Sequence, residues 1–468
     1  MKRTLILSFI SGLVGLSALT GCIEDGVATS PSAQPVFSTD TLSLGDNFNL
    51  TPTSTARFKA YNRGDKILSI SSVTLREKEQ GTFRVNVDGM SGQSFRDVEI
   101  RPGDSIYIFV EATLPATGLG ELSTVYGYLD FVTNGVGSTV VIKACGQDAE
   151  RLSAYRVKAP GESWDATMPR VIFDSLIVEP GATLTLAPGS QLYFHDKSYL
   201  KVYGTLQAQG RPDSPVKLTG DRRGNVVGNI PFDLMASQWE GLIFAPESSG
   251  SMLSHAVVSN TVAGVTAETG SQVTFHNCRL RNSAGNSLTA VHAEVTLTGC
   301  EVADAGGSAL SVTGGSLRAS HCTFANYYLF VYPHEPIVSF GHTLAGSDDD
   351  DGSGRPVAVA EISNSIFAGL SSDFSPGSLD GTQIYLRGCV FRGHGTDDDH
   401  FISSTWGYEP DWGVDRQAYI FDYRLSPESS LHGSASPLLT PDDAAVDLTG
   451  TPRLPSPTPG AYQQCLDL

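Results

Sequence analysis

Three cysteines at a constant spacing constrain the fold of this chain more than any other feature. Cys278, Cys300 and Cys322 follow one another at intervals of 22 residues. The residue two places after each cysteine is apolar: Leu280, Val302 and Phe324. A fixed period of about 20 to 25 residues with short alternating strands predicts a solenoid, in which each repeat buries its apolar face only by stacking on its neighbours.

Equivalent positions on successive turns of a solenoid point the same way, so the cysteines are expected to form one column. We interpret them as buried thiols that fill the core, while disulfide pairing remains the alternative. No C-x-x-C pair supports a zinc site. A second column holds Asn260, Asn282, Asp304 and Asn326. These residue types tolerate left-handed backbone and bond turn backbone, which predicts a structural role.

Residues 149–421 carry further signs of the repeat. The motifs are Gly204-Thr205-Leu206-Gln207-Ala208-x-Gly210, Pro215-Val216-x-Leu218 and Trp239-x-Gly241-Leu242. They resemble the entry turns of the right-handed parallel β-helix repeat family, which implies an all-β, pectate-lyase-like solenoid. Insertions near 327–362 and 393–419 interrupt the repeat. The first is either one irregular turn or a large loop.

Residues 36–148 differ in character, because short alternating runs separated by turn signals predict a β-sandwich. The motifs Phe58-x-x-Tyr61-Asn62-x-Gly64 and Pro102-Gly103-Asp104-Ser105 are similar to those of immunoglobulin-like modules of the ASH group. That resemblance implies a spacer or interaction domain.

Residues 422–468 are predicted to form a C-terminal cap, since an open solenoid end exposes core and unpaired strand edges. The motifs Asp447-Leu448-x-Gly450-x-Pro452-Arg453 and Pro459-Gly460-Ala461-Tyr462-Gln463 resemble the choice-of-anchor Q ending of bacterial surface β-helices. Pro459 and Gln463 depart from that pattern. The predicted cap lies over the last turn.

The first residues of the sequence have the pattern of a signal peptide, which predicts that the protein is exported. Lys2 and Arg3 precede an apolar stretch that ends in Leu19-Thr20-Gly21-Cys22. This resembles the lipobox of bacterial lipoproteins, which implies a signal peptide over 1–21, acylation of Cys22 and a flexible tether over 22–35. The implied location is the cell outer membrane, surface-exposed and lipid-anchored. The alternative is an ordinary secretory signal with a chance cysteine.

Net charge and the placement of charged residues limit the classes of partner and activity that this chain can have. The formal net charge is −19, and no basic stripe is present, which argues against a nucleic-acid partner. Polysaccharide lyases and glycosidases of this fold need paired carboxylates or a calcium cluster with a basic residue. The two outward columns beside the cysteines contain one carboxylate, Glu301, next to Arg279. We interpret the two as a cross-strand ion pair, and predict no catalytic residue, metal or cofactor.

Other candidate ligands are weaker. His255 and His321 are three periods apart, too far to share a metal. The aspartate runs at 348–351 and 397–399 fit solvated acidic loops better than calcium sites, and the first fails the EF-hand pattern.

The aromatic residues of the two insertions are the candidate glycan-binding set: Trp406, Tyr408, Trp412, Tyr327 and Tyr328. Flat rings beside hydrogen-bonding groups suit sugars. The alternative is that they pack as a cluster holding the insertion to the solenoid. The sequence thus predicts a non-catalytic surface scaffold that binds glycans or host surfaces. The alternative function is a polysaccharide lyase or glycoside hydrolase with its site on the β-helix surface. The oligomeric state stays open.

Overall fold

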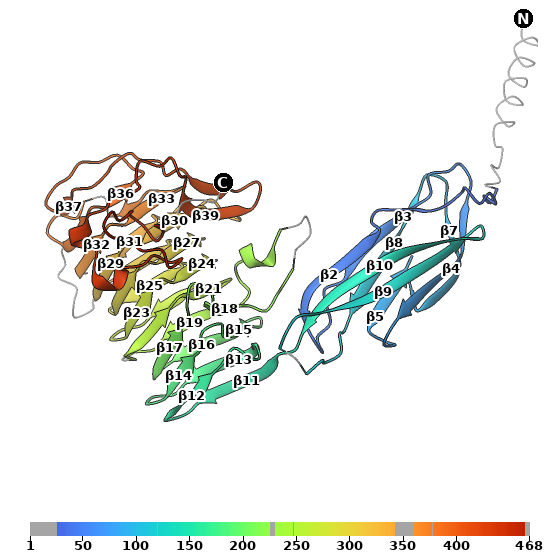
Figure 1. Ribbon diagram of the computed structural model, residues 1–468, viewed down its shortest axis with the longest axis horizontal. Coiled ribbons are helices and arrows are strands. Elements are labelled where there is room, and N and C mark those ends of the chain that lie inside the picture. Colours follow the sequence, from blue (N-terminus) through green and yellow to red (C-terminus); the bar gives the residue numbers. More distant parts are fainter. Residues whose placement is uncertain are drawn as a thin grey trace, which may run out of the picture. The chain divides into compact units, whose positions relative to one another are not determined.

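The computed structural model describes residues 26–118, 120–224, 230–246, 248–341, 359–376 and 378–463. It is nearly all-β and divides into two compact units, one comprising residues up to 116 and 122–146, the other 117–121 and the residues from 147 onward (Figure 1). Among the described residues no helix is both long and apolar enough to cross a membrane. The predicted signal peptide and Cys22 lie outside the described residues. The helical elements described are the short 3-10 turns η2 (Phe232–Leu234), η3 (Pro437–Leu439) and η4 (Asp442–Ala444).

The N-terminal unit contains two five-stranded sheets. The first has the order β1 (Val36–Phe37), β3 (Ala56–Tyr61), β8 (Ser105–Ala112), β5 (Phe83–Val87) and β6 (Met90–Gly92). The second has the order β2 (Thr41–Phe48), β10 (Val136–Gln147), β9 (Ser123–Thr133), β4 (Leu68–Glu77) and β7 (Ser94–Ile100). Alternate residues of both sheets, such as Phe58, Ile108 and Phe131, enter one shared apolar core. The alternation predicted from the sequence therefore separates an inner from an outer face.

The second unit is built on two long parallel sheets. The 10-stranded sheet has the order β12 (Gly161–Trp164), β14 (Thr183–Leu186), β17 (Thr205–Gln209), β20 (Ser251–Ser254), β23 (Gln272–His276), β26 (Glu294–Thr298), β29 (Ser316–Ser320), β32 (Val359–Ser363), β35 (Gln383–Arg387) and β37 (Phe401–Ile402). From β14 to β35, each strand pairs with the strand three places later in the chain, as β23 does with β26 and β26 with β29. Repeat-like parallel pairing is compatible with the predicted solenoid.

The 17-stranded sheet takes two strands from most repeats. Its order is β11 (Glu150–Val157), β13 (Arg170–Val178), β15 (Gln191–Phe194), β16 (Tyr199–Val202), β18 (Val216–Gly220), β19 (Gly241–Phe244), β21 (Ala256–Ser259), β22 (Val265–Ala267), β24 (Arg279–Ser283), β25 (Leu288–Val291), β27 (Glu301–Ala305), β28 (Leu310–Thr313), β30 (Thr323–Asn326), β31 (Val338–Gly341), β33 (Ile366–Gly369), β34 (Phe374–Ser375) and β36 (Val390–Phe391).

The predicted register is confirmed in this sheet. Leu280 pairs with Val302, Val302 with Phe324, and Phe324 with Phe367. Because β30 pairs directly with β33, the first insertion is one irregular turn rather than a loop that replaces two turns. The cysteines Cys278, Cys300, Cys322 and Cys389 are free thiols and fully buried, as the core-filling interpretation predicts.

The asparagine column supports the turns, as predicted. Asn260, Asn282 and Asp304 have left-handed backbone with φ of 66°, 55° and 52°. Asn326 donates through Nδ2 to the carbonyl oxygens of Ala305 and Gly307, each at 2.9 Å. The side-chain amide thereby satisfies turn backbone that the sheet ladder leaves unpaired.

The C-terminal residues 411–463, here called the strap, occupy a different place from the predicted cap. They begin with the antiparallel pair β38 (Trp412–Asp415) and β39 (Ile420–Leu425) and then run along the outward side of the 17-stranded sheet (Figure 1). Strap residues form apolar clusters with Ala303, Ala325, Ile366 and Val390, which face outward. The predicted position over the last turn is therefore corrected, because this outward face is itself apolar and needs cover.

The last turn is covered by another residue. Phe324, Phe367 and Phe391 stack along the core with ring centroids 5.1 and 4.9 Å apart. Trp406 stacks on Phe391 at 4.4 Å and 24°. The indole of the second insertion thus ends the aromatic column.

Candidate functional site

The carboxylate predicted for the outward surface lies in the interior. Glu301 on β27 is 1% exposed, because the strap covers it. The Arg281 Nη1 atom is 3.2 Å from Glu301 Oε1, and the Arg279 Nε atom is 4.0 Å from Glu301 Oε2. The predicted cross-strand ion pair with Arg279 is therefore one edge of a buried network rather than a surface contact.

Two tyrosines of the strap complete this network. The Tyr423 hydroxyl donates to Asp304 Oδ1 at 2.5 Å, and the Tyr462 hydroxyl donates to Glu301 Oε2. Arg281 Nη2 lies 3.5 Å from Asp304 Oδ2. Burying charges is expensive unless they are paired and hydrogen-bonded, and here each carboxylate has both an arginine and a tyrosine partner.

The electrostatics agree with a closed structural cluster. Burial alone disfavours the Arg281 cation, but Glu301 and Asp304 outweigh it, so the pKa of Arg281 is raised. Burial raises the pKa of Asp304, although Arg281 and Tyr423 oppose the shift. Neither carboxylate of the network is accessible to a substrate. The network therefore holds the strap to the sheet and is a poor catalytic centre.

The two histidines considered for metal binding lie in separate surroundings. His321 is fully buried and its Nε2 atom lies 2.9 Å from Thr440 Oγ1 of the strap. Burial lowers its pKa to about 3, and that of His255 to about 4. Within the described ranges no group of three or more His, Cys, Asp or Glu could hold a metal ion.

The five candidate glycan-binding aromatic residues are distributed over two places. Trp406 ends the core column and donates through Nε1 to Asp397 Oδ1 at 3.1 Å. Tyr327 meets Trp412 of the strap edge to face at 5.8 Å, and Tyr328 is 6% exposed. Tyr408 packs against the apolar cluster around Ile366. These contacts match the packing alternative, and glycan binding by this set stays a prediction.

The second aspartate run has local partners. Asp398 Oδ1 accepts from the backbone N–H groups of His400 and Phe401 at 2.7 and 2.9 Å. Asp397 accepts from Ser404 and from Trp406. Turn bonding explains these residues. The run at 348–351 lies outside the described residues.

A polar group at the edge of the strap was missed by the sequence reading. The Arg392 Nη1 atom is 3.5 Å from Glu409 Oε2, and the Tyr327 hydroxyl donates to Glu409 Oε1 at 3.4 Å. Asp373 accepts from the Gly393 N–H at 2.6 Å, and burial raises its pKa to about 6. A carboxyl with such a pKa can donate a proton near neutral pH, and the charge of Glu409 contributes to the raised pKa of Asp373. Asp373 gave no sequence signal, because it lies in an irregular turn.

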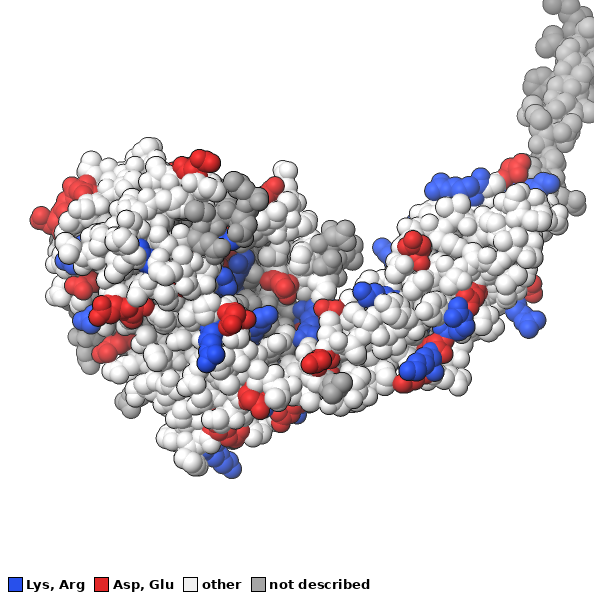
Figure 2. Space-filling model, in the orientation of Figure 1, with Lys and Arg blue, Asp and Glu red and all other residues white. Residues whose placement is uncertain are grey.

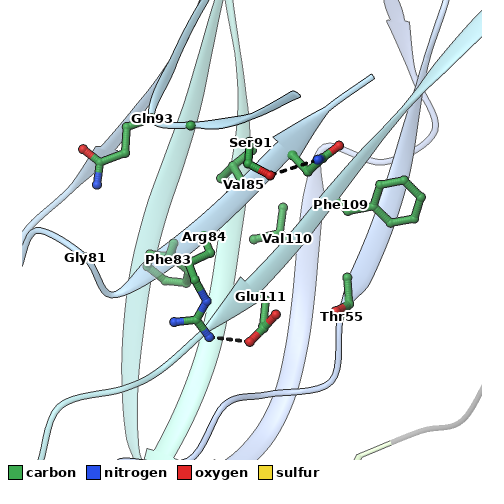
Figure 3. A pocket seen from close by; sticks show the side chains of 12 residues that line it. Thr55, Gly81, Phe83, Arg84, Val85, Ser91, Gln93, Phe109, Val110 and Glu111 are labelled. Atoms are coloured by element: carbon green, nitrogen blue, oxygen red, sulfur yellow. Dashed lines mark hydrogen bonds and ion pairs between the residues drawn. The ribbon is translucent and has the colours of Figure 1, made fainter. Parts of the chain in front are cut away.

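A hollow of about 390 Å³ lies on the outer side of the first sheet of the N-terminal unit (Figure 3). Its lining comes from β5, β6 and β8 and from residues just before β3, before β5 and after β6. Figure 3 shows the ion pair between Arg84 and Glu111 on one side of the hollow. The Asn86 Nδ2 group donates to Ser91 Oγ at 3.1 Å. The sequence contained no catalytic set here, and the lining contains none.

Comparisons with known proteins identify no family for this chain. No family model matches the chain, and no curated protein matches its sequence. One solved structure, a family 123 glycoside hydrolase from Clostridium perfringens described for glycolipid glycan hydrolysis, is similar over 26% of this chain and 26% of its own. The identity is 6% and the TM-score 0.18, and a similarity of this extent carries no argument about fold or activity.

Proposed function

We propose that this chain is a non-catalytic, lipid-anchored protein of the cell outer membrane that acts as a binding or structural scaffold. One observation carries the proposal. Glu301, the outward carboxylate that could have contributed to a groove, and its neighbour Asp304 are both buried and bonded to strap tyrosines. The side chains that would supply chemistry are thus used to hold the molecule together.

The proposed architecture is an immunoglobulin-like β-sandwich over 36–148 followed by a right-handed parallel β-helix over 149–421. The shared core of the two five-stranded sheets supports the first part. Pairing of each strand with the strand three places later supports the second. Such a stack presents a long, rigid surface, which suits display or binding more than a moving active site.

The anchor is proposed from the lipobox-like residues that end at Cys22. Acylation at this cysteine by several chains gives firm membrane attachment, whereas one chain would be marginal. The test is metabolic labelling with a palmitate analogue in cells that produce the protein or its Cys22→Ala variant. Loss of label in the variant is expected, and unchanged labelling would contradict the anchor.

The scaffold role is tested by presenting the purified protein to a glycan array and to soluble polysaccharides. Binding without release of shortened or unsaturated products is expected. The rival enzymatic function has one observation in its favour, since Asp373 has a pKa near 6 and lies near Arg392 and Glu409. A general acid and a second carboxylate are what glycoside hydrolysis requires. Product formation by the wild type that is lost in Asp373→Asn would replace the scaffold proposal.

A further inference from the structure

The outer side of β3 and β8 carries an unusual row of aromatic and basic side chains, here called the aromatic face: Arg57, Lys59, Tyr61, Tyr107 and Phe109. Strand alternation directs them away from the core, since Phe58, Ala60 and Ile108 point inward and are buried. Lys59 lies opposite Tyr107 and Arg57 opposite Phe109 in the strand register. The face is therefore continuous across two neighbouring strands.

The side chains of the aromatic face contact one another. The rings of Tyr107 and Phe109 stack at 5.8 Å and 25°. The Lys59 ammonium lies 4.5 Å from the Tyr107 ring centroid, and the Arg57 guanidinium 5.3 Å from it. Hydrogen bonding to Tyr107 raises the pKa of Lys59, so the ammonium keeps its charge. Tyr107 is still 37% exposed, which leaves ring surface for a ligand.

The hollow of Figure 3 adjoins this face through Phe109, which lies opposite Asn86 on β5. Its rim offers hydrogen-bonding groups of several kinds: Asn86, Ser91, Gln93, Arg84 and Glu111. A volume of about 390 Å³ is within the range of small-ligand sites, roughly 300 to 1,000 Å³. The groove thus combines a flat ring surface with polar partners suited to hydroxyl groups.

The charge of the face stands out on an acidic protein. Among the described residues no carboxylate is within ion-pair distance of Arg57 or Lys59, whereas Arg84 pairs with Glu111. On the side of the molecule shown in Figure 2, acidic and basic side chains are interspersed. Two cations without carboxylate partners on a chain of net charge −19 favour an anionic ligand at this place.

We propose that the aromatic face and its hollow bind an acidic polysaccharide. Sugar rings stack on Tyr107 and Phe109, carboxylate or sulfate groups meet Lys59 and Arg57, and hydroxyl groups bond the polar rim of the hollow. A neutral glycan would provide no anionic group to pair with Lys59 and Arg57. A nucleic acid would use the cations, but it would meet strong repulsion from the rest of the surface. This inference rests on the proposed scaffold function and names its ligand class and site.

The test compares two double variants of the full-length protein. Lys59→Ala with Tyr107→Ala removes one cross-strand pair from the aromatic face. Lys143→Ala with Tyr126→Ala removes the same residue types from the same cross-strand arrangement on the other sheet, since Lys143 lies opposite Tyr126. The two variants lose equal charge and equal aromatic area. Thermal unfolding followed by circular dichroism checks that both stay folded.

Binding is measured by affinity electrophoresis in gels containing polygalacturonate, heparin, neutral dextran or single-stranded DNA. We expect the wild type and the Lys143/Tyr126 variant to be retarded by the acidic polysaccharides and not by dextran. The Lys59/Tyr107 variant should bind at least about tenfold more weakly, since it loses a stacking and a charge contact. Retardation should weaken with added salt.

Three results would overturn the inference: no retardation of the wild type by either acidic polymer, equal loss in both variants, or stronger retardation by DNA. Binding that survives unchanged in the Lys59/Tyr107 variant would also overturn the proposed site, while it would leave the scaffold function standing. Product formation in the gel or in solution would instead contradict the scaffold function itself.

Discussion

At the scale of single residues, the polar groups beneath the strap explain most about this protein. Arg281 and Glu301 are largely buried where strand alternation would place solvent, and Asp304 is buried beside them in the asparagine column. Glu301 and Asp304 accept hydrogen bonds that only the strap supplies, from Tyr462 and Tyr423. A buried charge that loses its partner costs several kcal/mol, so these residues make attachment of the strap specific to one register.

Replacement of Arg281 tests this role. Arg281→Ala leaves Glu301 and Asp304 buried without their shared cation, and we expect the free energy of unfolding to fall by about 3 kcal/mol or more. The exposed Arg318→Ala on β29 is the matched control and should change it by less than about 0.5 kcal/mol. Urea unfolding followed by tryptophan fluorescence measures both. Equal stability of the two variants would show that the network contributes little.

His321 predicts a pH dependence. Its folded pKa of about 3 lies below the ordinary value of 6.5, so the unfolded chain binds more protons between these values. The stability that neutral His321 contributes is therefore fully present above pH 6.5 and lost as the pH falls toward 3. We expect the wild type to lose about 2 kcal/mol more than His321→Gln between pH 8 and pH 5.

The exposed His334→Gln is the control for that experiment and should follow the wild type. Asp304 and Asp373 act in the opposite direction, because their raised pKa values favour the folded state at lower pH. Comparing the variants at each pH removes their shared contribution. A His321→Gln protein with the same pH profile as the wild type would refute the assignment.

At the scale of elements, the second insertion is tied to the parallel sheets through its aromatic side chain. Trp406 stacks on Phe391 and meets Phe401 at 5.1 Å, edge to face. The insertion thereby covers the end of the core, where an exposed stack of phenylalanine rings would otherwise meet water. The strap covers the flank. The second insertion and the strap therefore share the covering role that the sequence analysis predicted for a single C-terminal cap.

Trp406→Ala separates this structural role from glycan binding. If the indole closes the core, we expect the free energy of unfolding to fall by about 2 to 3 kcal/mol, less than for a fully buried tryptophan because the ring is half-buried. The control is Phe330→Ala, a 40% exposed aromatic residue of the first insertion, which should change stability little. Differential scanning calorimetry measures both. Unchanged stability of Trp406→Ala together with lost glycan binding would instead support the candidate glycan site.

At the scale of the whole molecule, the chain consists of two units with separate cores. Residues of one core do not appear in the other, so each unit can unfold by itself. The second unit is built on two long parallel sheets with repeat-like pairing, whereas the first contains two five-stranded sheets.

We expect two thermal transitions, and core variants should move them one at a time. Phe131→Ala should lower the transition of the N-terminal unit, and Leu297→Ala that of the parallel-sheet unit, each by about 2 to 5 kcal/mol of unfolding free energy. Both residues are fully buried, so each serves as the control for the other. A single transition that both variants shift equally would mean that the units unfold together.

Periodicity was enough to predict the parallel pairing. Leu280, Val302 and Phe324 fall into register because a constant repeat length places equivalent residues on neighbouring strands. The buried thiols and the left-handed asparagines follow from the same columns. The alternating runs of residues 36–148 likewise correspond to strands such as β3 and β8, in which alternate residues are buried. Local pattern is sufficient wherever the contacts join residues one repeat or one hairpin apart.

Only the tertiary structure revealed the position of the strap, the buried ion network and the packing of the candidate aromatic residues. The outward columns already contained Ala303, Ala325, Ile366 and Val390, an apolar signal that some segment must cover. Which segment does so depends on contacts such as Tyr462 to Glu301, which are 161 residues apart in the chain. Strand alternation says which way a side chain points. It does not say what packs against that side chain, because the energy of that contact depends on two segments that are far apart in the sequence.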